Sequence, residues 1–263
     1  MIDSHVHLSY EPVADQLAKR GVLGVVDLAA PEVTLRNPSP IAVIAAGPML
    51  THGGGYPLDA WGSAGYGVGC DDAACVTATI DRLAAHGAGV IKLALDDDGL
   101  APALVPVAVA AAHAHGLKVA VHALTEQSAA RAAAAGVDVL AHTPVERLSD
   151  ATVAAWRGRA VISTLAAFGG SDAAVDNLRR LRAAGATILY GTDLGNTHDD
   201  GPSADEVALL RNAGLDDAAI TAAMTTTPIA YWHFDLGGAY LVLDGDPRHD
   251  VRQLLHPRGV HNR

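Results

Sequence analysis

Short runs rich in valine, isoleucine and leucine alternate with longer alanine-rich stretches along the whole chain. This alternation is typical of repeated βα units that build a parallel sheet. It predicts eight strands, at 2–8, 22–28, 41–46, 89–95, 117–122, 137–142, 160–164 and 187–191. Helices are predicted between and after these strands, at 11–20, 71–87, 101–116, 126–135, 149–157, 171–184, 203–213 and 216–231.

Eight parallel strands with interleaved helices favour a closed (β/α)8 barrel of the TIM type, an α/β fold. The competing fold is an open doubly wound sheet, but no glycine-rich dinucleotide fingerprint follows the first strand. The segment 238–246 predicts one extra strand and a turn outside the βα rhythm. We therefore predict a barrel over 1–235, with a C-terminal strand and tail over 236–263 in the same domain.

One long connection, 48–70, is predicted to lack a helix and contains seven glycines. Long loops in compact domains are more often functional than inert. In a barrel the loops after the strands set specificity, so 48–70, 164–170 and 196–201 are expected to line a pocket. We predict substrate contacts from His52, Tyr56, Thr125 and His198, although loop polar groups without a ligand are the simpler interpretation of the two histidines.

The formal net charge is −11, and the chain holds only three lysines. A nucleic-acid partner is therefore not expected, because phosphate binding needs clustered Lys and Arg. No basic segment followed by an apolar stretch opens the chain, so no membrane association is expected. The two cysteines, Cys70 and Cys75, are predicted to be free thiols in a reducing compartment. These features predict a cytoplasmic protein with a small-molecule substrate.

Ionisable residues stand at the C-terminal ends of five of the predicted strands. His5 and His7 share one face of the first strand, because a strand points residues i and i+2 to the same side. Imidazole suits zinc, iron, copper and nickel, so the pair by itself names no metal. A single such histidine is more often a core residue, but a barrel would bring all of these strand ends to one mouth. The residues at the other four strand ends are Lys92, His122, His142 and Asp193.

Lys92 lies in an apolar strand, where an unpaired ammonium would cost several kcal/mol to desolvate. A snorkelling or ion-paired lysine is one interpretation. The other is that its amine takes up carbon dioxide to form a carbamate, which can bridge two metal ions. Asp193 follows the last strand and could cap a turn. At a histidine-lined mouth it could instead bind metal and accept a proton from water.

Five segments, 3–8, 87–93, 119–123, 135–142 and 191–193, carry a resemblance to a known family. The chain resembles the amidohydrolase superfamily, in the branch of imidazolonepropionase-like proteins and prolidase-type peptidases. The resemblance implies two divalent metal ions, most often zinc. One ion would be held by His5, His7 and Asp193 and the other by His122 and His142, with N6-carboxylated Lys92 and a hydroxide bridging them. Asp193 would be the catalytic proton acceptor in hydrolysis of an amide, a cyclic amide or a related C–N or C–O bond.

The chain departs from the family pattern in two ways. Family members usually carry a β-sandwich segment before the His-x-His strand, whereas here only two residues precede Asp3. Either the member is reduced or the amino terminus is missing, and an apolar barrel end left by the absent strands could be covered by a second copy in a homo-oligomer. The loops at 96–98 and 196–200 are acidic, which indicates either a solvated rim or a preference for neutral or cationic substrates.

Other functions stay open at this point. A decarboxylase or cyclodehydratase would share the same metal ligands and differ only in loop residues. A mononuclear deaminase would lack the lysine on the fourth strand, so Lys92 argues against it. A metal-free binding protein is disfavoured because all six expected ligands are present.

Overall fold

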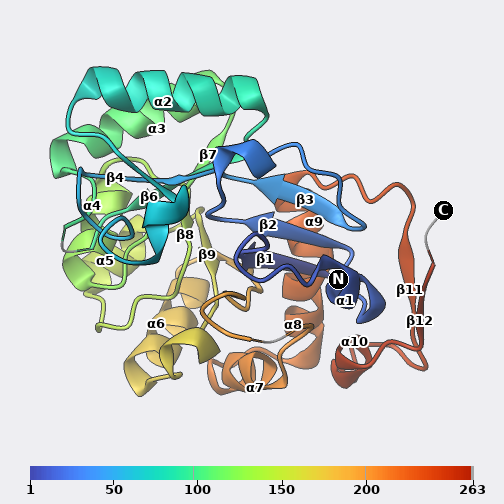
Figure 1. The fold of residues 1–263 in the computed structure, drawn as a ribbon. Helices are drawn as coiled ribbons and strands as arrows, with labels where there is room; N and C mark the ends of the chain where they lie inside the picture. Colours follow the sequence, from blue (N-terminus) through green and yellow to red (C-terminus); the bar gives the residue numbers. More distant parts are fainter. Residues whose placement is uncertain (97, 199, 262–263) are drawn as a thin grey trace.

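The eight predicted strands are all present in the computed structural model, which describes residues 1–96, 98–198 and 200–261. They form the central parallel barrel seen in Figure 1. Most of their residues are buried on both faces, which explains why these strands are continuous apolar runs. Their bounds are β1 (Ile2–Val6), β2 (Gly24–Asp27), β3 (Ala42–Ala45), β6 (Val90–Ala94), β7 (Lys118–His122), β8 (Val139–Leu140), β9 (Ala160–Ile162) and β10 (Thr187–Leu189).

Two seams close the barrel. One sheet runs β1-β2-β3, and a second places β10, β9, β8, β7 and β6 side by side, all parallel. Gly89 N donates to Ala45 O at 2.9 Å, which joins β6 to β3. Ser4 N donates to Tyr190 O at 2.9 Å, which joins β1 to the end of β10. The prediction of a (β/α)8 barrel is confirmed.

Helices surround the barrel (Figure 1), and most begin at a side-chain cap. Asp72, Ser149, Ser171, Ser203 and Asp216 each accept a hydrogen bond from a first-turn backbone N–H. The helices are α1 (Ala14–Lys19), α2 (Ala73–His86), α3 (Val105–Ala114), α4 (Glu126–Ala134), α5 (Asp150–Ala155), α6 (Asp172–Ala183), α7 (Ala204–Asn212), α8 (Asp217–Met224), α9 (Thr226–Trp232) and α10 (Arg252–Leu255).

The single helix predicted over 216–231 is wrong, because the structure divides it into α8 and α9. Thr225 between them has φ −135° and ψ −89°, outside the helical region. The helix α10 was not predicted, because it is only four residues long.

The long connection 48–70 has more structure than the sequence predicts. It contains β4 (Met49–Thr51) and β5 (Gly67–Gly69), which pair in parallel, and the short 3₁₀ helix η2 (Trp61–Ala64). Leu50 of β4 also pairs with Leu93 of β6, so β4 extends the barrel wall next to β3. The connection is therefore fixed to the barrel at both of its ends.

The C-terminal segment forms a two-stranded antiparallel sheet where one strand was predicted. β11 (Tyr240–Val242) pairs with β12 (Gly259–His261), and both lie beside the barrel near α1 and α10 in Figure 1. The second strand was missed because it lies outside the βα rhythm and owes its conformation to pairing with β11. Coverage of a barrel end by a second copy stays a prediction.

The prediction of free thiols is wrong, because Cys70 and Cys75 form a disulfide. Cys70 follows β5 directly, and Cys75 lies in the first turn of α2. The turn capped by Asp72 brings the two Cα atoms to 5.4 Å, a separation that suits a disulfide. The predicted cytoplasmic location thereby loses the support of the cysteines and stays a prediction.

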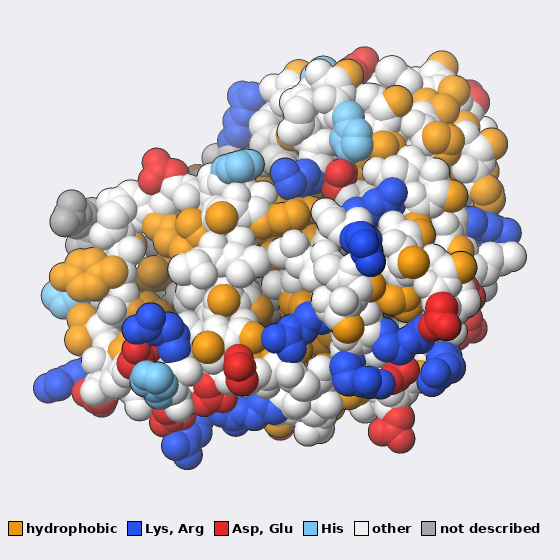
Figure 2. All heavy atoms as spheres, turned by 180° about the vertical axis from the view of Figure 1, so that it is seen from behind, with side chains coloured by type: hydrophobic (Ala, Val, Ile, Leu, Met, Phe, Trp, Pro, Cys, Tyr) orange, Lys and Arg blue, Asp and Glu red, His pale blue; other side chains and the backbone are white. Residues whose placement is uncertain are grey.

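The apolar core fills the space between the barrel and its helices, with Trp156 and Tyr190 among the largest side chains that are fully buried. Most charged side chains lie at the surface, and on the face shown in Figure 2 Lys and Arg lie among Asp and Glu. Within the described residues, no helix combines the length and the apolar character needed to cross a membrane.

Candidate metal centre and pocket

A cavity of about 480 Å³ opens at the C-terminal ends of the barrel strands. All six side chains predicted as metal ligands line it, although they come from five separate segments of the chain. Active sites of TIM barrels lie at this end. The described lining residues are His5, His7, Tyr10, Met49, Tyr56, Trp61, Lys92, His122, Leu124, His142, Phe168, Asp193, Gly195 and Asn196.

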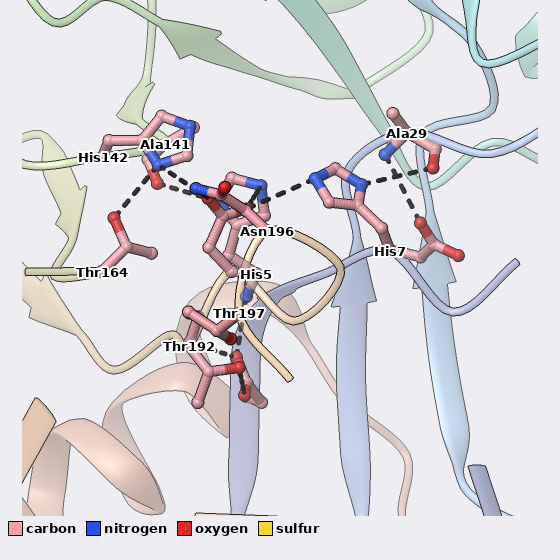
Figure 3. A network of polar contacts seen from close by, with 12 residues as sticks. His5, His7, Ala29, Ala141, His142, Thr164, Thr192, Asn196 and Thr197 are labelled. Carbon is pink, nitrogen blue, oxygen red and sulfur yellow. Dashed lines mark hydrogen bonds and ion pairs between the residues drawn. The ribbon is translucent and has the colours of Figure 1, made fainter. Parts of the chain in front are cut away.

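His5, His7 and Asp193 form the tightest group in this cavity. One ligand atom from each lies within 4.8 Å of the others. Asp193 Oδ1 is 3.2 Å from His5 Nε2 and 3.3 Å from His7 Nε2. Figure 3 shows the ring of His5 between those of His7 and His142. This is the donor set expected for the first metal ion.

Backbone and hydroxyl groups fix which ring nitrogen of each histidine faces the cavity. His5 Nδ1 lies 2.9 Å from Ala141 O, so it donates there and leaves Nε2 with a free lone pair. His7 Nδ1 similarly lies 3.3 Å from Ala29 O. These contacts are drawn in Figure 3. Both Nε2 atoms are thereby turned toward Asp193.

Two buried atoms at this point have no hydrogen-bond partner among the described residues: His5 Nε2 and Asp193 Oδ1. With Nδ1 of His5 donating to a carbonyl, both atoms are acceptors, yet they lie 3.2 Å apart. Buried polar atoms are seldom left unsatisfied. A cation between them would satisfy both, so the site fits a metal ion.

Asp193 is held in a specific orientation. Its backbone has φ +57°, an uncommon value for a residue other than glycine and one that clusters at functional sites. Its amide donates to His5 O at 2.9 Å, which ties it to β1. Asn196 Nδ2 donates to Asp193 Oδ2 at 3.1 Å, so Oδ1 is the oxygen left for the histidines.

Lys92, His122 and His142 extend the site from the neighbouring strands. The ring of His142 lies 4.5 Å from that of His5 and 4.9 Å from that of His122, centroid to centroid. Lys92 is 1% exposed, and its Nζ has no hydrogen bond or ion pair among the described residues. Burial lowers the pKa of Lys92 to about 7, only partly opposed by Asp193. A neutral amine therefore exists here near pH 7.

Three histidines of the cavity are uncharged, which is the state that metal binding requires. Burial lowers the pKa values of His5 and His142 well below their usual range. Burial also lowers the pKa of His122 to about 4, with the nearby Lys92 acting in the same direction. All three are neutral at physiological pH, so their lone pairs are available to a cation.

The residues predicted to contact substrate are dispersed. Tyr56 lines the cavity, whereas the structure does not place the other three in its described lining. His52 lies 3.8 Å from Asp71 at the surface. Thr125 caps α4. His198, with 83% of its side chain exposed, lies 3.3 Å from Glu11.

The aromatic residues Tyr10, Trp61 and Phe168 are pocket residues that the sequence did not reveal as such. Each lies in a connection, where no periodicity indicates which way a side chain points. A signal did exist, because Trp61 falls in the long connection 48–70 and Phe168 in 164–170, both expected to line the pocket. Tyr10 follows His7 by only three residues.

Among the described residues of the acidic loops, Asp96 has a carboxylate that faces inward. Asp96 accepts hydrogen bonds from Leu124 N, Ser128 Oγ and Thr125 Oγ1, so it fixes the loop before α4 instead of forming a solvated rim. Asp97 and Asp199, which belong to the same acidic runs, lie outside the described residues.

Comparison with known proteins gives no match to a protein-family model. Three curated relatives, uncharacterised proteins of Mycobacterium bovis and Mycobacterium tuberculosis, are 30% identical over 184 residues. The match covers 58% of this chain and 49% of theirs, so the chain spans about half the length of these relatives.

Solved structures match the chain almost throughout. A Xaa-Pro dipeptidase is 18% identical with a TM-score of 0.80, over 98% of this chain and 83% of its own. The A. niger ochratoxinase is 18% identical with a TM-score of 0.77, over 98% and 80%. Molinate hydrolase is 16% identical with a TM-score of 0.72, over 99% and 80%. The chain has the amidohydrolase fold. Within that fold, its histidines, lysine and aspartate lie at the strand ends where the sequence resemblance places the metal ligands.

Proposed function

We propose that the protein is a binuclear metal-dependent hydrolase that cleaves an amide, a cyclic amide or a related C–N or C–O bond of a small molecule. The observation that carries this proposal is the pair of buried acceptors, His5 Nε2 and Asp193 Oδ1, that converge without a hydrogen-bond partner. The amidohydrolase fold supports it, since solved structures with this fold include a dipeptidase, an ochratoxinase and a molinate hydrolase.

The ligands divide into two sets. His5, His7 and Asp193 would hold the first ion, and His122 and His142 the second. Lys92 lies in the same cavity, and as an N6-carboxylated lysine it would give each ion one oxygen. Burial of the Lys92 amine favours this modification, because it lowers the pKa of the amine and because the carbamate replaces a buried ammonium by an anion with metal partners. Nitrogen and oxygen donors of this kind suit zinc.

Bound divalent ions would lower the pKa of water and polarise the substrate carbonyl. The protein's own contribution is to position groups and to move a proton. Asp193 accepts the proton of the attacking water and passes it to the leaving nitrogen or oxygen. Asn196, which donates to Asp193 Oδ2, keeps the carboxylate in the orientation for this transfer.

Metal analysis of the purified, zinc-supplemented protein tests the proposal. We expect about two equivalents per chain, and one or fewer in Lys92→Ala. Lys118→Ala is the matched control, because Lys118 lies at the opposite end of the neighbouring strand β7 and its Nζ contacts the ring of Tyr231. Mass spectrometry under non-acidic conditions should find about 44 Da, the mass of carbon dioxide, added to the wild type and not to Lys92→Ala. A wild type without bound metal contradicts the proposal.

A further inference from the structure

Aromatic side chains are concentrated around the cavity, although the chain has few of them. Tyr10, Tyr56, Trp61 and Phe168 line it, and Tyr66 packs against the ring of Trp61 at 5.7 Å. The whole chain contains only three Trp, six Tyr and two Phe. Nearly half of its aromatic residues therefore gather at one site.

These rings form two aromatic walls that pack against the histidine cluster. In the first wall, the ring of Trp61 lies 5.2 Å from that of His7, and Tyr10 and Tyr56 lie edge-on to Trp61. The second wall is Phe168, whose ring lies 4.7 Å from that of His142. A substrate whose reacting bond reaches the histidines would therefore lie against aromatic rings.

The rings are not filling space in the core. Half of Tyr10 is exposed, and Tyr56, Trp61 and Phe168 keep part of their surface accessible. Apolar surface that faces a cavity is covered favourably by a planar apolar group, and offset or edge-to-face aromatic pairs add to the benefit. The larger Trp61 wall suits a ring, and the Phe168 wall suits a smaller group.

The walls offer no partner for an anionic group. Among the described lining residues there is no arginine, and the basic side chain Lys92 is buried at the level of the histidines. A substrate carboxylate away from the reacting bond would thus be desolvated without a counterion. A cationic group would not meet this penalty, because the ring faces of the walls attract cations.

We propose that this site takes substrates in which the amide or related bond carries an aryl group that packs on Trp61, and that it disfavours substrates with a free carboxylate. This inference rests on the proposed hydrolase function and specifies its substrate class. It makes Trp61 a residue that determines specificity.

Four matched compounds test the inference on the zinc-loaded protein: acetanilide, 4-acetamidobenzoate, (4-acetamidophenyl)trimethylammonium and N-cyclohexylacetamide. Binding is measured by ligand-observed NMR titration, and turnover by product analysis in oxygen-18 water. We expect acetanilide to bind at least tenfold more tightly than the anion and the cyclohexyl compound, and the cation to bind more tightly than the anion. Binding of the anion or the cyclohexyl compound as tight as that of acetanilide, or of the anion as tight as that of the cation, would overturn the inference.

Variants of Trp61 assign the effect to the aromatic wall. Trp61→Ala should weaken acetanilide binding about tenfold, and Trp61→Phe should restore most of it. The control is Tyr240→Ala, because Tyr240 is half exposed on β11, away from the described lining of the cavity. Circular dichroism and metal content show whether each variant is folded and loaded. Unchanged acetanilide binding in a folded, loaded Trp61→Ala would also overturn the inference.

The two proposals fail in different ways. Metal binding and oxygen-18 incorporation without any preference for the aryl compound would reject the substrate class and keep the hydrolase. A preference for acetanilide in a protein that binds no metal would keep the aromatic subsite and reject the hydrolase.

Discussion

At the scale of single residues, Asp3 links the two strand ends that carry the tightest ligand group. Its carboxylate accepts hydrogen bonds from His5 N at 3.1 Å, from Thr192 N at 3.1 Å and from Thr192 Oγ1 at 2.6 Å. Thr192 immediately precedes Asp193. Asp3 is 1% exposed, and burial raises its pKa to about 7. The three hydrogen bonds offset the free-energy cost of burying this carboxyl group. We therefore expect Asp3 to act as a positioning residue for the first proposed metal ion.

We predict that Asp3→Asn weakens zinc binding about 10- to 100-fold, as loss of an outer partner of metal ligands commonly does. It should also lower the free energy of unfolding by about 1–3 kcal/mol, because the amide group can no longer accept from all three donors. Zinc titration with a competing chelator and urea denaturation measure the two effects.

Asp216→Ala separates stability from positioning. Asp216 caps α8 by accepting from Ala219 N at 2.8 Å, so its loss should cost about 0.5–2 kcal/mol of stability. Zinc affinity should stay at the wild-type value. An Asp3→Asn variant that loses stability while binding zinc normally would contradict the positioning role.

The residues that the sequence predicted and those it missed differ in one physical respect. His5, His7 and His142 stand at the ends of strands, where a fixed twofold periodicity and a common barrel mouth determine where a side chain points. Trp61 and Phe168 stand in connections, where the direction of a side chain depends on tertiary contacts. The convergence of the strand-end side chains on one cavity could therefore be predicted, whereas for the walls only the connections 48–70 and 164–170 and the residue Tyr56 could be.

At the scale of elements, the distinction is whether a strand belongs to the repeated βα units. The strands that repeat with the βα rhythm were predicted within a few residues. β4, β5 and β12 have three residues each and owe their conformation to their pairing partners. The disulfide between Cys70 and Cys75 depends on one of these, because β5 and the cap of α2 bring the two cysteines together.

We predict that reduction of this disulfide lowers the free energy of unfolding by about 2 kcal/mol, the loop-entropy value for a closed loop of about six residues. Urea denaturation of the wild type with and without reductant measures the loss. The double variant with Cys70→Ala and Cys75→Ala is the control and should not respond to reductant. Two thiols reacting in the denatured, unreduced protein would show that the bond is absent.

At the scale of the whole molecule, the barrel brings residues that are far apart in the sequence together in one site. The six residues proposed as ligands span from His5 to Asp193, and the seam between β1 and the end of β10 brings those two together. The repeated βα pattern, without a dinucleotide fingerprint after the first strand, favoured a closed barrel, in which the strand ends meet at one mouth. The size and chemistry of the cavity could not be predicted from the sequence, because they depend on how the connections pack.

This convergence predicts that metal removal destabilises the whole barrel. An ion held by residues from several strands ties their ends together and satisfies the buried acceptors His5 Nε2 and Asp193 Oδ1. A ligand that binds only the folded state stabilises it by about 2.7 kcal/mol at one hundred times its dissociation constant. For a chain of this size we expect chelation to lower the melting temperature by roughly 5–10 °C. Differential scanning calorimetry of chelated and zinc-reconstituted protein measures the shift.

The His7→Ala variant should show little difference in melting temperature between the chelated and zinc-reconstituted forms. The His113→Ala variant should show the full wild-type difference, because His113 lies at the surface, 2.9 Å from Asp138. Identical melting curves with and without zinc would show that the strand ends hold no tightly bound ion.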